Sequence, residues 1–320
     1  NGAGNSIYGY VIAGFPSGSN NSTIDRIDYA NDTATAVQKG PYFKSSANWY
    51  MAGVGNSSYG YWSGDEGNVS NSSTVGRLDY SNDTATLVSL TNLPDNGNHK
   101  AGTSPLMNGF PTMAPGPKVT DKGADGILTI ADYPSAFGYG YVSAGPSASF
   151  VSRMDYSNDT ATGVSKGPDD NSGVKASTSS ETHGYLMGGY DPNADTTIKR
   201  IDYASDTSTT VSRGNLSAPS LLSIAGQGTH TPSYGWMMTF YPGGPINRID
   251  FANDTATASN RQNGPSVIKT STTGNQSYGW KVGGSGDVTT VLRLDYANDT
   301  TSLSPRVNLA LGNDLADAFG

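Results

Sequence analysis

A ten-residue motif that occurs six times is the sequence feature that most constrains how this chain folds. It first appears as Arg26-Ile-Asp-Tyr-Ala-Asn-Asp-Thr-Ala-Thr35. The other copies, at spacings of 51, 76, 47, 48 and 45 residues, begin at Arg77, Arg153, Arg200, Arg248 and Arg293. Self-similarity at a fixed period of about 20–50 residues is typical of solenoids and propellers. The chain is therefore built from six copies of one structural unit.

Each copy is preceded, 14 to 18 residues earlier, by an aromatic-Gly-aromatic triplet. The first triplet is Tyr8-Gly9-Tyr10. The other five begin at Tyr59, Tyr139, His183, Tyr234 and Tyr278. Each repeat therefore has two fixed landmarks.

The composition argues against a mainly helical repeat. The 320 residues include only two Glu and ten Lys, so the side chains that usually cover helix surfaces are scarce. Gly, Tyr, Thr, Asn and Ser are abundant, which is typical of short strands joined by tight turns. The chain has no Cys, so disulfides and thiolate metal sites are excluded.

The hydrophobic pattern predicts four strands in each repeat. In the first repeat, Val11–Gly14 extends the triplet as a buried strand, and Ile24–Tyr29 alternates along the next strand. We expect a turn at Ala30–Thr33, followed by Ala34–Val37 as the hairpin partner. The remaining strand is expected before the following triplet, for example at Trp49–Val54 and Leu221–Ala225.

Four antiparallel strands in about 48 residues, repeated six times, predict an all-β fold: a six-bladed β-propeller forming one domain over residues 1–320. Asn1–Ser6 matches only the segment that follows the opening strand in the second repeat, so the first repeat is predicted to lack that strand. We expect Asn308–Ala318 to supply it. The N- and C-terminal segments would then close the ring and remove its two exposed sheet edges.

The second spacing contains an insertion. From Val88 to Tyr139 there are 51 residues where the other repeats use 19 to 23, so about 30 residues are inserted near 92–126. Loops of this length in compact domains are usually functional or disordered. Ile127–Ile130 is expected to resume the blade. The candidate contact residues in this loop are Met107, Phe110, Met113, Lys118 and Lys122.

The repeat resembles a kelch repeat, in which a strand ending in Gly-Gly is followed by a strand with an acidic-aromatic corner. Gly188-Gly189 and Gly283-Gly284 keep the double glycine, whereas Ala13-Gly14 and Ala144-Gly145 relax it. The Trp that usually follows the corner is replaced by Ala or Ser, so the repeat is kelch-like. The two motifs together are also similar to repeats in structural and tail proteins of marine bacteriophages, including cyanophages. This second resemblance implies a phage virion protein.

The repeated Arg and Asp are the most conspicuous polar residues. On a strand, residues i and i+2 share a face, so each Arg lies beside the Asp two positions later. One hypothesis is a ring of six identical binding sites. The other, which we favour, is an Arg–Asp bridge between neighbouring blades, because a buried charge needs a partner. The repeat residues concerned are Arg26 and Asp28, Arg77 and Asp79, Arg153 and Asp155, Arg200 and Asp202, Arg248 and Asp250, and Arg293 and Asp295.

Two other kinds of motif have structural explanations. Hairpin geometry already accounts for Asn and Asp in the five Asn-Asp-Thr sequons, whose glycosylation requires a secretory pathway. These sequons begin at Asn31, Asn82, Asn158, Asn253 and Asn298. Asp121–Gly126 and Asp169–Gly173 resemble calcium loops but lack the full spacing and closing Glu, so no cofactor is expected and calcium is only a weak alternative.

Signals of catalysis are weak. The three histidines, His99, His183 and His230, are scattered, and nothing brings Glu66 and Glu181 together as a carboxylate pair. The chain has no phosphate loop and no Gly-x-Ser-x-Gly elbow. We therefore expect the protein not to be an enzyme.

The formal net charge of −8 argues against a phosphate-binding surface, so no nucleic acid partner is expected. No window of 18 apolar residues occurs, so no membrane insertion is expected. The leading hypothesis is a non-enzymatic structural or host-attachment module of a phage tail, nozzle or fibre. Its partners would be other virion proteins or a host-surface glycan, within a larger symmetric assembly. The alternative is a lectin-like propeller of a secreted or surface protein, so the expected location is virion or extracellular.

Overall fold

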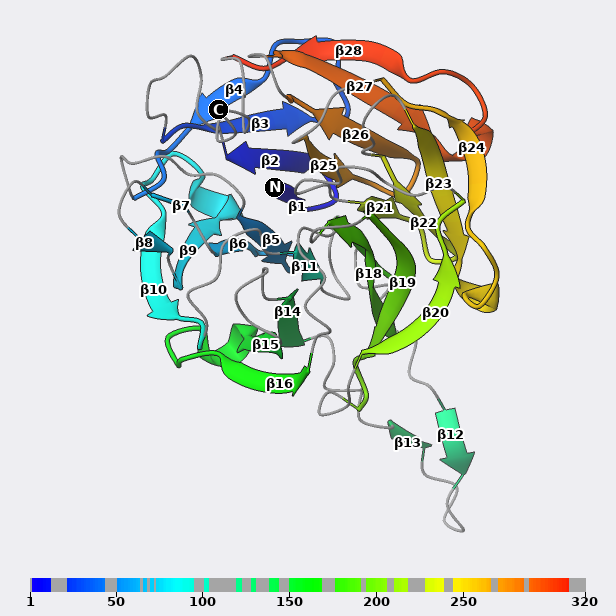
Figure 1. The fold of residues 1–320 in the computed structure, drawn as a ribbon. Coiled ribbons are helices and arrows are strands. Elements are labelled where there is room, and N and C mark those ends of the chain that lie inside the picture. Colours follow the sequence, from blue (N-terminus) through cyan, green and yellow to red (C-terminus); the bar gives the residue numbers. More distant parts are fainter. Residues whose placement is uncertain are drawn as a thin grey trace.

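The computed structural model describes residues 2–12, 22–43, 51–63, 66–67, 70–71, 73–94, 101–103, 119–122, 128–130, 138–143, 150–168, 176–190, 194–205, 210–217, 228–238, 244–265, 270–284 and 288–310. These residues form six four-stranded antiparallel sheets arranged as the blades of a propeller (Figure 1). The described segments contain strands and short 3-10 helices but no α-helix. The prediction of an all-β, six-bladed propeller is confirmed.

The first three blades take their strands in chain order, from the innermost to the outermost. Blade 1 contains β1 (Gly2–Gly4), β2 (Tyr8–Ile12), β3 (Ile24–Asp28) and β4 (Val37–Lys39). Blade 2 contains β5 (Ala52–Gly55), β6 (Tyr59–Ser63), β9 (Thr74–Asp79) and β10 (Val88–Asn92), with a small hairpin of β7 (Glu66–Gly67) and β8 (Ser70–Asn71). Blade 3 contains β11 (Ala101–Thr103), β14 (Tyr139–Ser143), β15 (Phe150–Asp155) and β16 (Val164–Pro168).

The last three blades repeat this order. Blade 4 contains β17 (Ala176–Ser179), β18 (His183–Tyr190), β19 (Ala194–Asp202) and β20 (Val211–Asn215). Blade 5 contains β21 (Gly228–His230), β22 (Tyr234–Met237), β23 (Pro245–Asp250) and β24 (Ser259–Asn263). Blade 6 contains β25 (Ser271–Gly274), β26 (Tyr278–Val282), β27 (Thr290–Asp295) and β28 (Ser304–Asn308). Short 3-10 helices follow the third strand at η1 (Tyr80–Asn82), η3 (Tyr156–Asn158), η4 (Phe251–Asn253) and η5 (Tyr296–Asn298).

The inner strands pack directly on one another around the axis of the ring. Each of the six inner strands contacts the inner strands of both neighbouring blades. Small residues permit this approach, because a Cβ on Gly53 would lie 2.6 Å from the carbonyl oxygen of Gly2. A Cβ on Gly102 would lie 2.6 Å from the carbonyl oxygen of Gly53. The inner strands of neighbouring blades therefore pack backbone against backbone at these junctions.

Alternating strand direction gives the ring two different faces. The connection from the first to the second strand and that from the third to the fourth lie on one face, which we call the turn face. In blade 1 this face carries Asn5–Ile7 and the turn from Tyr29 to Ala36. The other connections lie on the opposite face. Because β1 starts and β28 ends there, residues 2 and 308 both lie toward the opposite face.

The double glycines have a conformational cause. Gly188 and Gly189 have φ angles of 62° and 147°, and Gly283 and Gly284 have φ angles of 65° and 136°. L-residues with a side chain rarely adopt such angles, whereas glycine does so without steric cost. Glycine thus permits the register shift between Met187 and Gly189 within β18, and it lets the chain leave β26 after Val282.

The ring is closed, but the predicted exchange of a terminal strand is wrong. The innermost strand of blade 1 is β1, which pairs with β2 through Gly2↔Val11 and Gly4↔Gly9. Asn308 is instead the last residue of β28, the outer strand of blade 6. Closure comes from packing of blade 1 on blade 6, where Val11 and Tyr29 join a buried cluster with Trp280. Each blade thus takes its four strands from its own stretch of the chain.

Three strand boundaries also differ from the prediction. Blade 1 makes a longer turn than expected, so its outer strand starts at Val37 instead of Ala34. In blade 2 the inner strand is shifted slightly, to Ala52–Gly55. Leu221–Ala225 lies outside the described residues, and the inner strand of blade 5 is Gly228–His230. These glycine- and polar-rich inner strands lack the apolar run used to predict them.

The insertion is in a different connection from the one predicted near 92–126. The inner strand β11 of blade 3 falls inside that range, and Leu93 ahead of it is buried. The extra chain instead lies between β11 and β14, which is the first turn of blade 3 on the turn face. Leu128–Ile130 does not resume a blade, because as β13 it pairs with β12 (Val119–Lys122) in a separate two-stranded sheet (Figure 1).

The hydrophobic core lies between blades, and Lys281 is an exception to its pattern. In the register of the blades, Lys281 of β26 stands where β2, β18 and β22 carry Val11, Leu186 and Met237. It is 2% exposed. Burial lowers the pKa of Lys281 from 10.5 to about 8. The charged amine is thus disfavoured in the folded state.

Substituting Lys281→Met should abolish the pH dependence of stability between pH 8 and 10.5 that the buried amine gives the parent protein, because the variant has no amine to titrate there. In the parent protein, stability should rise between pH 8 and 10.5, where the unfolded chain binds the proton and the folded chain does not. Chemical denaturation across pH measures both effects. An equal rise in the variant would contradict this assignment.

Substituting Gly9→Ala should destabilise the protein by about 1–3 kcal/mol through overpacking. A Cβ there would lie 2.6 Å from Thr273 Cγ2 of blade 6 and 2.8 Å from the Tyr29 hydroxyl. Gly138→Ala is the matched control, because nothing lies within 4 Å of its Cβ. Thermal unfolding compares the two variants, and equal melting temperatures would contradict the packing argument.

Candidate functional site

A buried aspartate joins each described pair of neighbouring blades. In blade 2, Asp83 lies in the turn after β9 and is buried. Its Oδ2 accepts hydrogen bonds from Arg26 NH1 at 2.7 Å and from the Tyr10 hydroxyl at 3.0 Å, both from blade 1. Lys39 Nζ, also from blade 1, lies 3.2 Å from Asp83 Oδ1. We call this arrangement, a turn aspartate held by donors from the preceding blade, an aspartate clamp.

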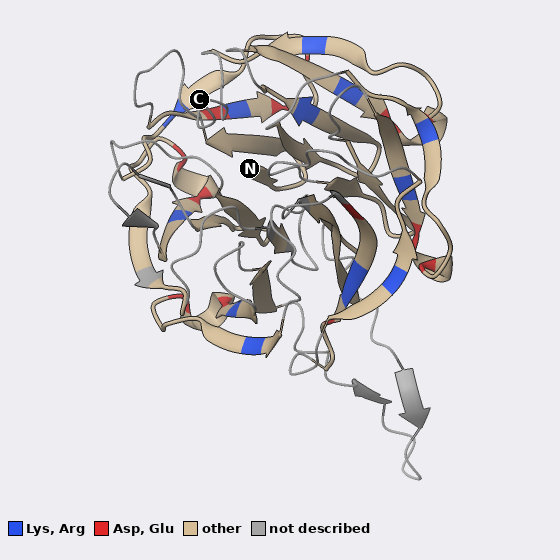
Figure 2. Cartoon of the chain, viewed as in Figure 1, with Lys and Arg blue, Asp and Glu red and all other residues tan. Residues whose placement is uncertain are grey.

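The clamp is repeated around the ring, with charges in every blade (Figure 2). An arginine of the preceding blade binds the turn aspartate at five described junctions: Arg26–Asp83, Arg77–Asp159, Arg200–Asp254, Arg248–Asp299 and Arg293–Asp32. The last of these joins blade 6 to blade 1. At the junction of blades 3 and 4, the corresponding turn position, 206, lies outside the described residues. The ring therefore uses one bond repeatedly, including at its closure.

The second donor of the clamp is either tyrosine or tryptophan. Tyr61 and Tyr185 donate their hydroxyls to Asp159 and Asp254. Trp236 and Trp280 donate their indole Nε1–H to Asp299 and Asp32, at 2.8 and 3.0 Å. The last aromatic residue of the triplet is thus selected for both its ring and its donor group.

The same aromatic residue stacks on the next blade at all six junctions. Its partner is the aromatic residue of the ten-residue motif, and the ring centroids are 4.4–5.0 Å apart. The stacked pairs are Tyr10–Tyr80, Tyr61–Tyr156, Tyr141–Tyr203, Tyr185–Phe251, Trp236–Tyr296 and Trp280–Tyr29. Offset stacking of this kind contributes about 0.5–1.5 kcal/mol beyond burial.

The first aromatic residue of the triplet supports the arginine. The Arg26 guanidinium lies over the Tyr8 ring, 4.2 Å from its centroid. The same contact occurs at 4.0–4.8 Å for Arg77, Arg153, Arg248 and Arg293. In blade 4 the triplet begins with His183, whose pKa is lowered by burial and by Arg200.

The aspartate that bridges the blades is not the one that lies two residues after each arginine. Asp79 Oδ1 accepts hydrogen bonds from the backbone N–H and the hydroxyl of Ser81, and so caps its own turn. Asp28, Asp155, Asp202, Asp250 and Asp295 accept the equivalent backbone bond. The bridge between blades is therefore present, but its acceptor is the seventh residue of the next blade's ten-residue motif. For Arg26 this acceptor is Asp83.

Backbone hydrogen bonds reinforce the rim. The residue before an outer strand donates its N–H to a carbonyl of the preceding outer segment, as Ala36 does to Asn308 at 2.9 Å. Leu87 donates to Pro41, Gly163 to Asn92 and Ala258 to Asn215. Neighbouring blades are thus joined at the centre, at the clamp and at the rim.

The surroundings of the clamp favour the ionised form of its aspartate. Burial alone would raise the pKa of Asp83, but hydrogen bonds from Lys39, Tyr10 and Arg26 outweigh it, so the pKa is lowered. The Tyr10 pKa is raised, by burial first and then by Asp83. The carboxylate is therefore charged and the phenol neutral at neutral pH, as the hydrogen bonds require.

Substituting Asp83→Ala should lower the free energy of unfolding by about 3–5 kcal/mol, because Arg26 and Lys39 lose their buried counter-charge. Asp79→Ala is the matched control in the same blade. It removes only a cap, so a loss of about 1 kcal/mol is expected. Urea denaturation measures both. If the two variants were equally stable, the clamp would not hold the blades together.

The remaining sequence candidates fall into three groups. The five sequon asparagines are all exposed in the clamp turns of the turn face. Met107, Phe110, Met113 and Lys118, together with Asp169–Gly173 and His99, lie outside the described residues. Lys122 is the last residue of β12, and Glu66 begins β7. Glu181 is exposed in the first turn of blade 4.

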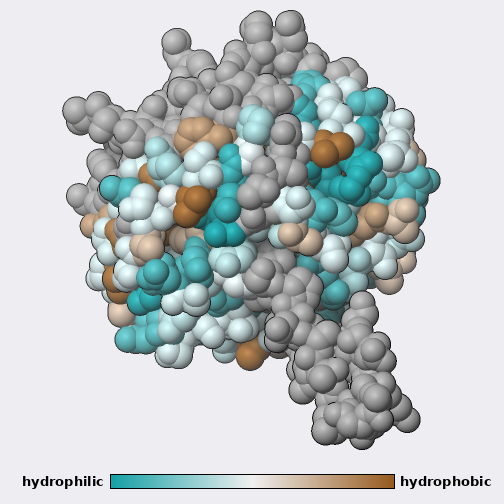
Figure 3. Space-filling model, turned by 90° about the horizontal axis from the view of Figure 1, so that it is seen from below, coloured by the Kyte–Doolittle hydropathy of each residue, from teal (hydrophilic) through white to brown (hydrophobic). Residues whose placement is uncertain are grey.

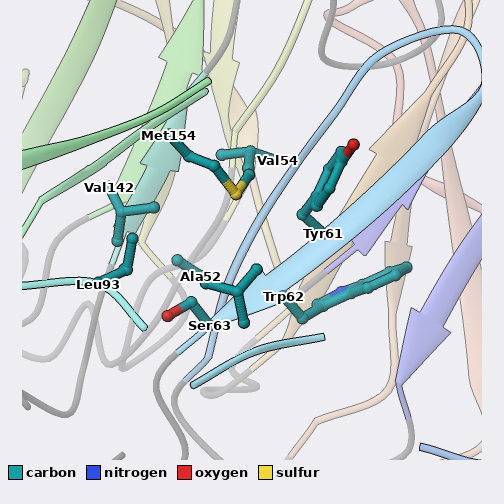
Figure 4. A pocket seen from close by; sticks show the side chains of 9 residues that line it. Ala52, Val54, Tyr61, Trp62, Ser63, Leu93, Val142 and Met154 are labelled. Carbon is teal, nitrogen blue, oxygen red and sulfur yellow. The ribbon is translucent and has the colours of Figure 1, made fainter. Parts of the chain in front are cut away.

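Among the residues that the structure describes, no group of three or more His, Asp or Glu is placed to hold a metal ion. Nor does any described helix have the length and apolar character needed to cross a membrane. An apolar depression lies between blades 2 and 3, where Val54 and Met154 point toward each other (Figure 4). The space among its side chains is too small for a water molecule.

The described surface carries isolated apolar side chains. Val37, Val88, Val164 and Val211, each the first residue of an outer strand, are 48–51% exposed. Figure 3 shows apolar spots scattered among polar residues on the visible side. Single apolar side chains of this kind are normal on protein surfaces.

Comparisons with known proteins support the fold and give no information on function. No family model matches the chain, and no curated protein matches it. A solved structure of YjhT is similar, with a TM-score of 0.66 and 10% sequence identity. The match covers 95% of this chain and 96% of that chain. At this identity the likeness supports the propeller fold alone.

Proposed function

We propose that the chain is a non-enzymatic structural or host-attachment module of a phage virion, acting as a rigid platform for interactions. The observation that carries this proposal is the clamp. The arginines and aspartates that dominate the repeat, and that would be the obvious acid–base or binding groups, are committed to bonds between blades. The repeat therefore serves the rigidity of the ring.

The virion part of the proposal depends on the repeat sequence. The triplet and the ten-residue motif resemble repeats of marine phage structural and tail proteins, and they span nearly the whole chain. A ring whose junctions share one stacked and charge-paired design suits a component that must keep its shape while its loops make contacts.

The contact is proposed to involve the insertion and the turn face. The insertion lies between β11 and β14, and so joins the ring on the turn face. Residues 2 and 308 are directed to the opposite face. The proposed contact therefore lies on the face opposite to residues 2 and 308.

The lectin alternative is less well supported by the described aromatic residues. Sugar rings usually stack on an exposed aromatic face, but a guanidinium covers the first tyrosine of the triplet in five blades, as Arg26 covers Tyr8. Binding of glycans to several blades would support the lectin function and contradict the structural one.

Replacing residues 104–138 by Gly-Asn-Ser-Ser, which in blade 2 is the last residue of β5 and the turn that joins it to β6, should preserve the ring and abolish partner binding. The circular dichroism spectrum should be unchanged and the melting temperature close to that of the parent. Co-sedimentation with the other virion proteins and a host-polysaccharide array measure binding.

The control is deletion of 92–126, which removes β11 and the buried Leu93 and should destabilise blade 3. Collapse of the shorter-turn variant would show that the insertion is structural. Full binding by that variant would place the contact elsewhere on the ring. Turnover of the polysaccharide by the parent protein would contradict the non-enzymatic proposal.

A further inference from the structure

Blade 5 departs from the repeat at two residues that belong to the same site. The last residue of its inner strand is His230, which pairs with Gly235. The equivalent residues in blades 1, 2 and 6 are Gly4, Gly55 and Gly274, and blade 4 has Ser179. The aromatic residue of its ten-residue motif is Phe251, where the other five copies have tyrosine.

The two departures are linked by a steric relation between the two positions. A Cβ on Gly4 would lie 3.0 Å from the Tyr29 hydroxyl, and a Cβ on Gly274 would lie 2.7 Å from the Tyr296 hydroxyl. The tyrosine hydroxyl therefore occupies the place beside this glycine. Blade 4 shows that a serine fits beside a tyrosine, whereas blade 5 combines the larger imidazole with a phenylalanine that has no hydroxyl.

His230 lies in the junction between blades 4 and 5. It is 2% exposed, and its Nδ1 is 3.5 Å from Ser179 Oγ of blade 4, which is fully buried. At the junction of blades 6 and 1, the Tyr29 hydroxyl bonds Thr273 Oγ1 at 2.6 Å. With no such hydroxyl in blade 5, Thr178 Oγ1 donates to the Thr229 carbonyl at 3.1 Å.

Several ionisable groups lie near this junction. On the blade 4 side, His183 and Tyr185 lie at the start of β18, with Arg200 on β19. Asp202 and Asp254 raise the pKa of His183, against burial and Arg200, and Asp254 binds Tyr185. On the blade 5 side, Tyr234 begins β22. For His230 the cause of the shift is burial, which lowers its pKa from 6.5 to about 3.

We propose that His230 makes the junction of blades 4 and 5 an acid-sensitive seam, which opens between β17 and β21 when the imidazole is protonated. His230 is almost fully buried, and burial favours the neutral ring over the imidazolium. The seam would be a property of one junction among six, set by the pairing of His230 with Phe251. It does not depend on the proposed virion role.

The direction of the pH effect follows from linkage. The folded-state pKa lies below the unfolded value, so the unfolded or opened chain binds the extra proton. Stability is complete above pH 6.5 and is lost as the pH falls below it. Each pH unit in this window changes the opening equilibrium about tenfold, so the change from pH 6.5 to 4.5 is about a hundredfold. At pH 4.5 carboxylates with ordinary pKa values are still mostly ionised.

The test compares the parent with the double variant His230→Gly, Phe251→Tyr, which restores the pair of residues found in blades 1, 2 and 6. His99 and His183 remain in both proteins. Hydrogen exchange is measured at pH 7 and pH 4.5, after correction for intrinsic rates. We expect the parent to lose about a hundredfold of protection in β17 and β21, relative to β1 and β5, and the variant to lose much less.

Three outcomes would overturn the proposal. Equal pH dependence in the two proteins would exclude His230, and a loss of protection spread evenly over all blades would exclude a local seam. If the variant does not fold, an NMR titration of the His230 imidazole in the parent decides instead. If His230 is protonated near pH 6.5 and the protection of β17 does not change, the seam is contradicted. If the imidazole stays neutral down to about pH 4 for as long as the junction is closed, the seam is supported.

Discussion

The bond between the turn aspartate and the arginine of the preceding blade is the interaction on which the ring depends. Asp83 has little exposure, and its charge is stable only because Arg26, Lys39 and Tyr10 surround it. Breaking a buried pair from one side costs more than the pair contributes, because the remaining charge stays buried. At the five junctions where both residues are described, the clamp therefore ties a blade to the one before it.

This dependence explains why the repeat is so regular. The aromatic donor, the arginine and the basic residue come from three successive strands of one blade, while the aspartate comes from a turn of the next. Their meeting requires the same strand register and the same turn in both blades. Tryptophan can replace tyrosine, as Trp280 does toward Asp32, because it keeps both the ring and a donor.

The period of the motif and its alternation were enough to predict six blades of four strands. The partner of the arginine was not predictable, because the motif offers an aspartate at two and at six residues after it. The spacing along one strand favoured Asp28, whereas the contact is made by a turn in the next blade. The inner strands were missed for a different reason. Gly2–Gly4 and Ala101–Thr103 are held by backbone packing around the axis, which leaves no hydrophobic pattern in the sequence.

Missing those inner strands also displaced the insertion. Once β11 is recognised, the extra chain moves from the connection between blades 2 and 3 to the first turn of blade 3, and so from the opposite face to the turn face. In a ring whose repeated polar residues hold its own blades, specific properties must come from departures from the repeat. The insertion in blade 3 and the His230–Phe251 pair in blade 5 are such departures. One adds a surface to a rigid frame, and the other weakens that frame at a single junction when the pH falls.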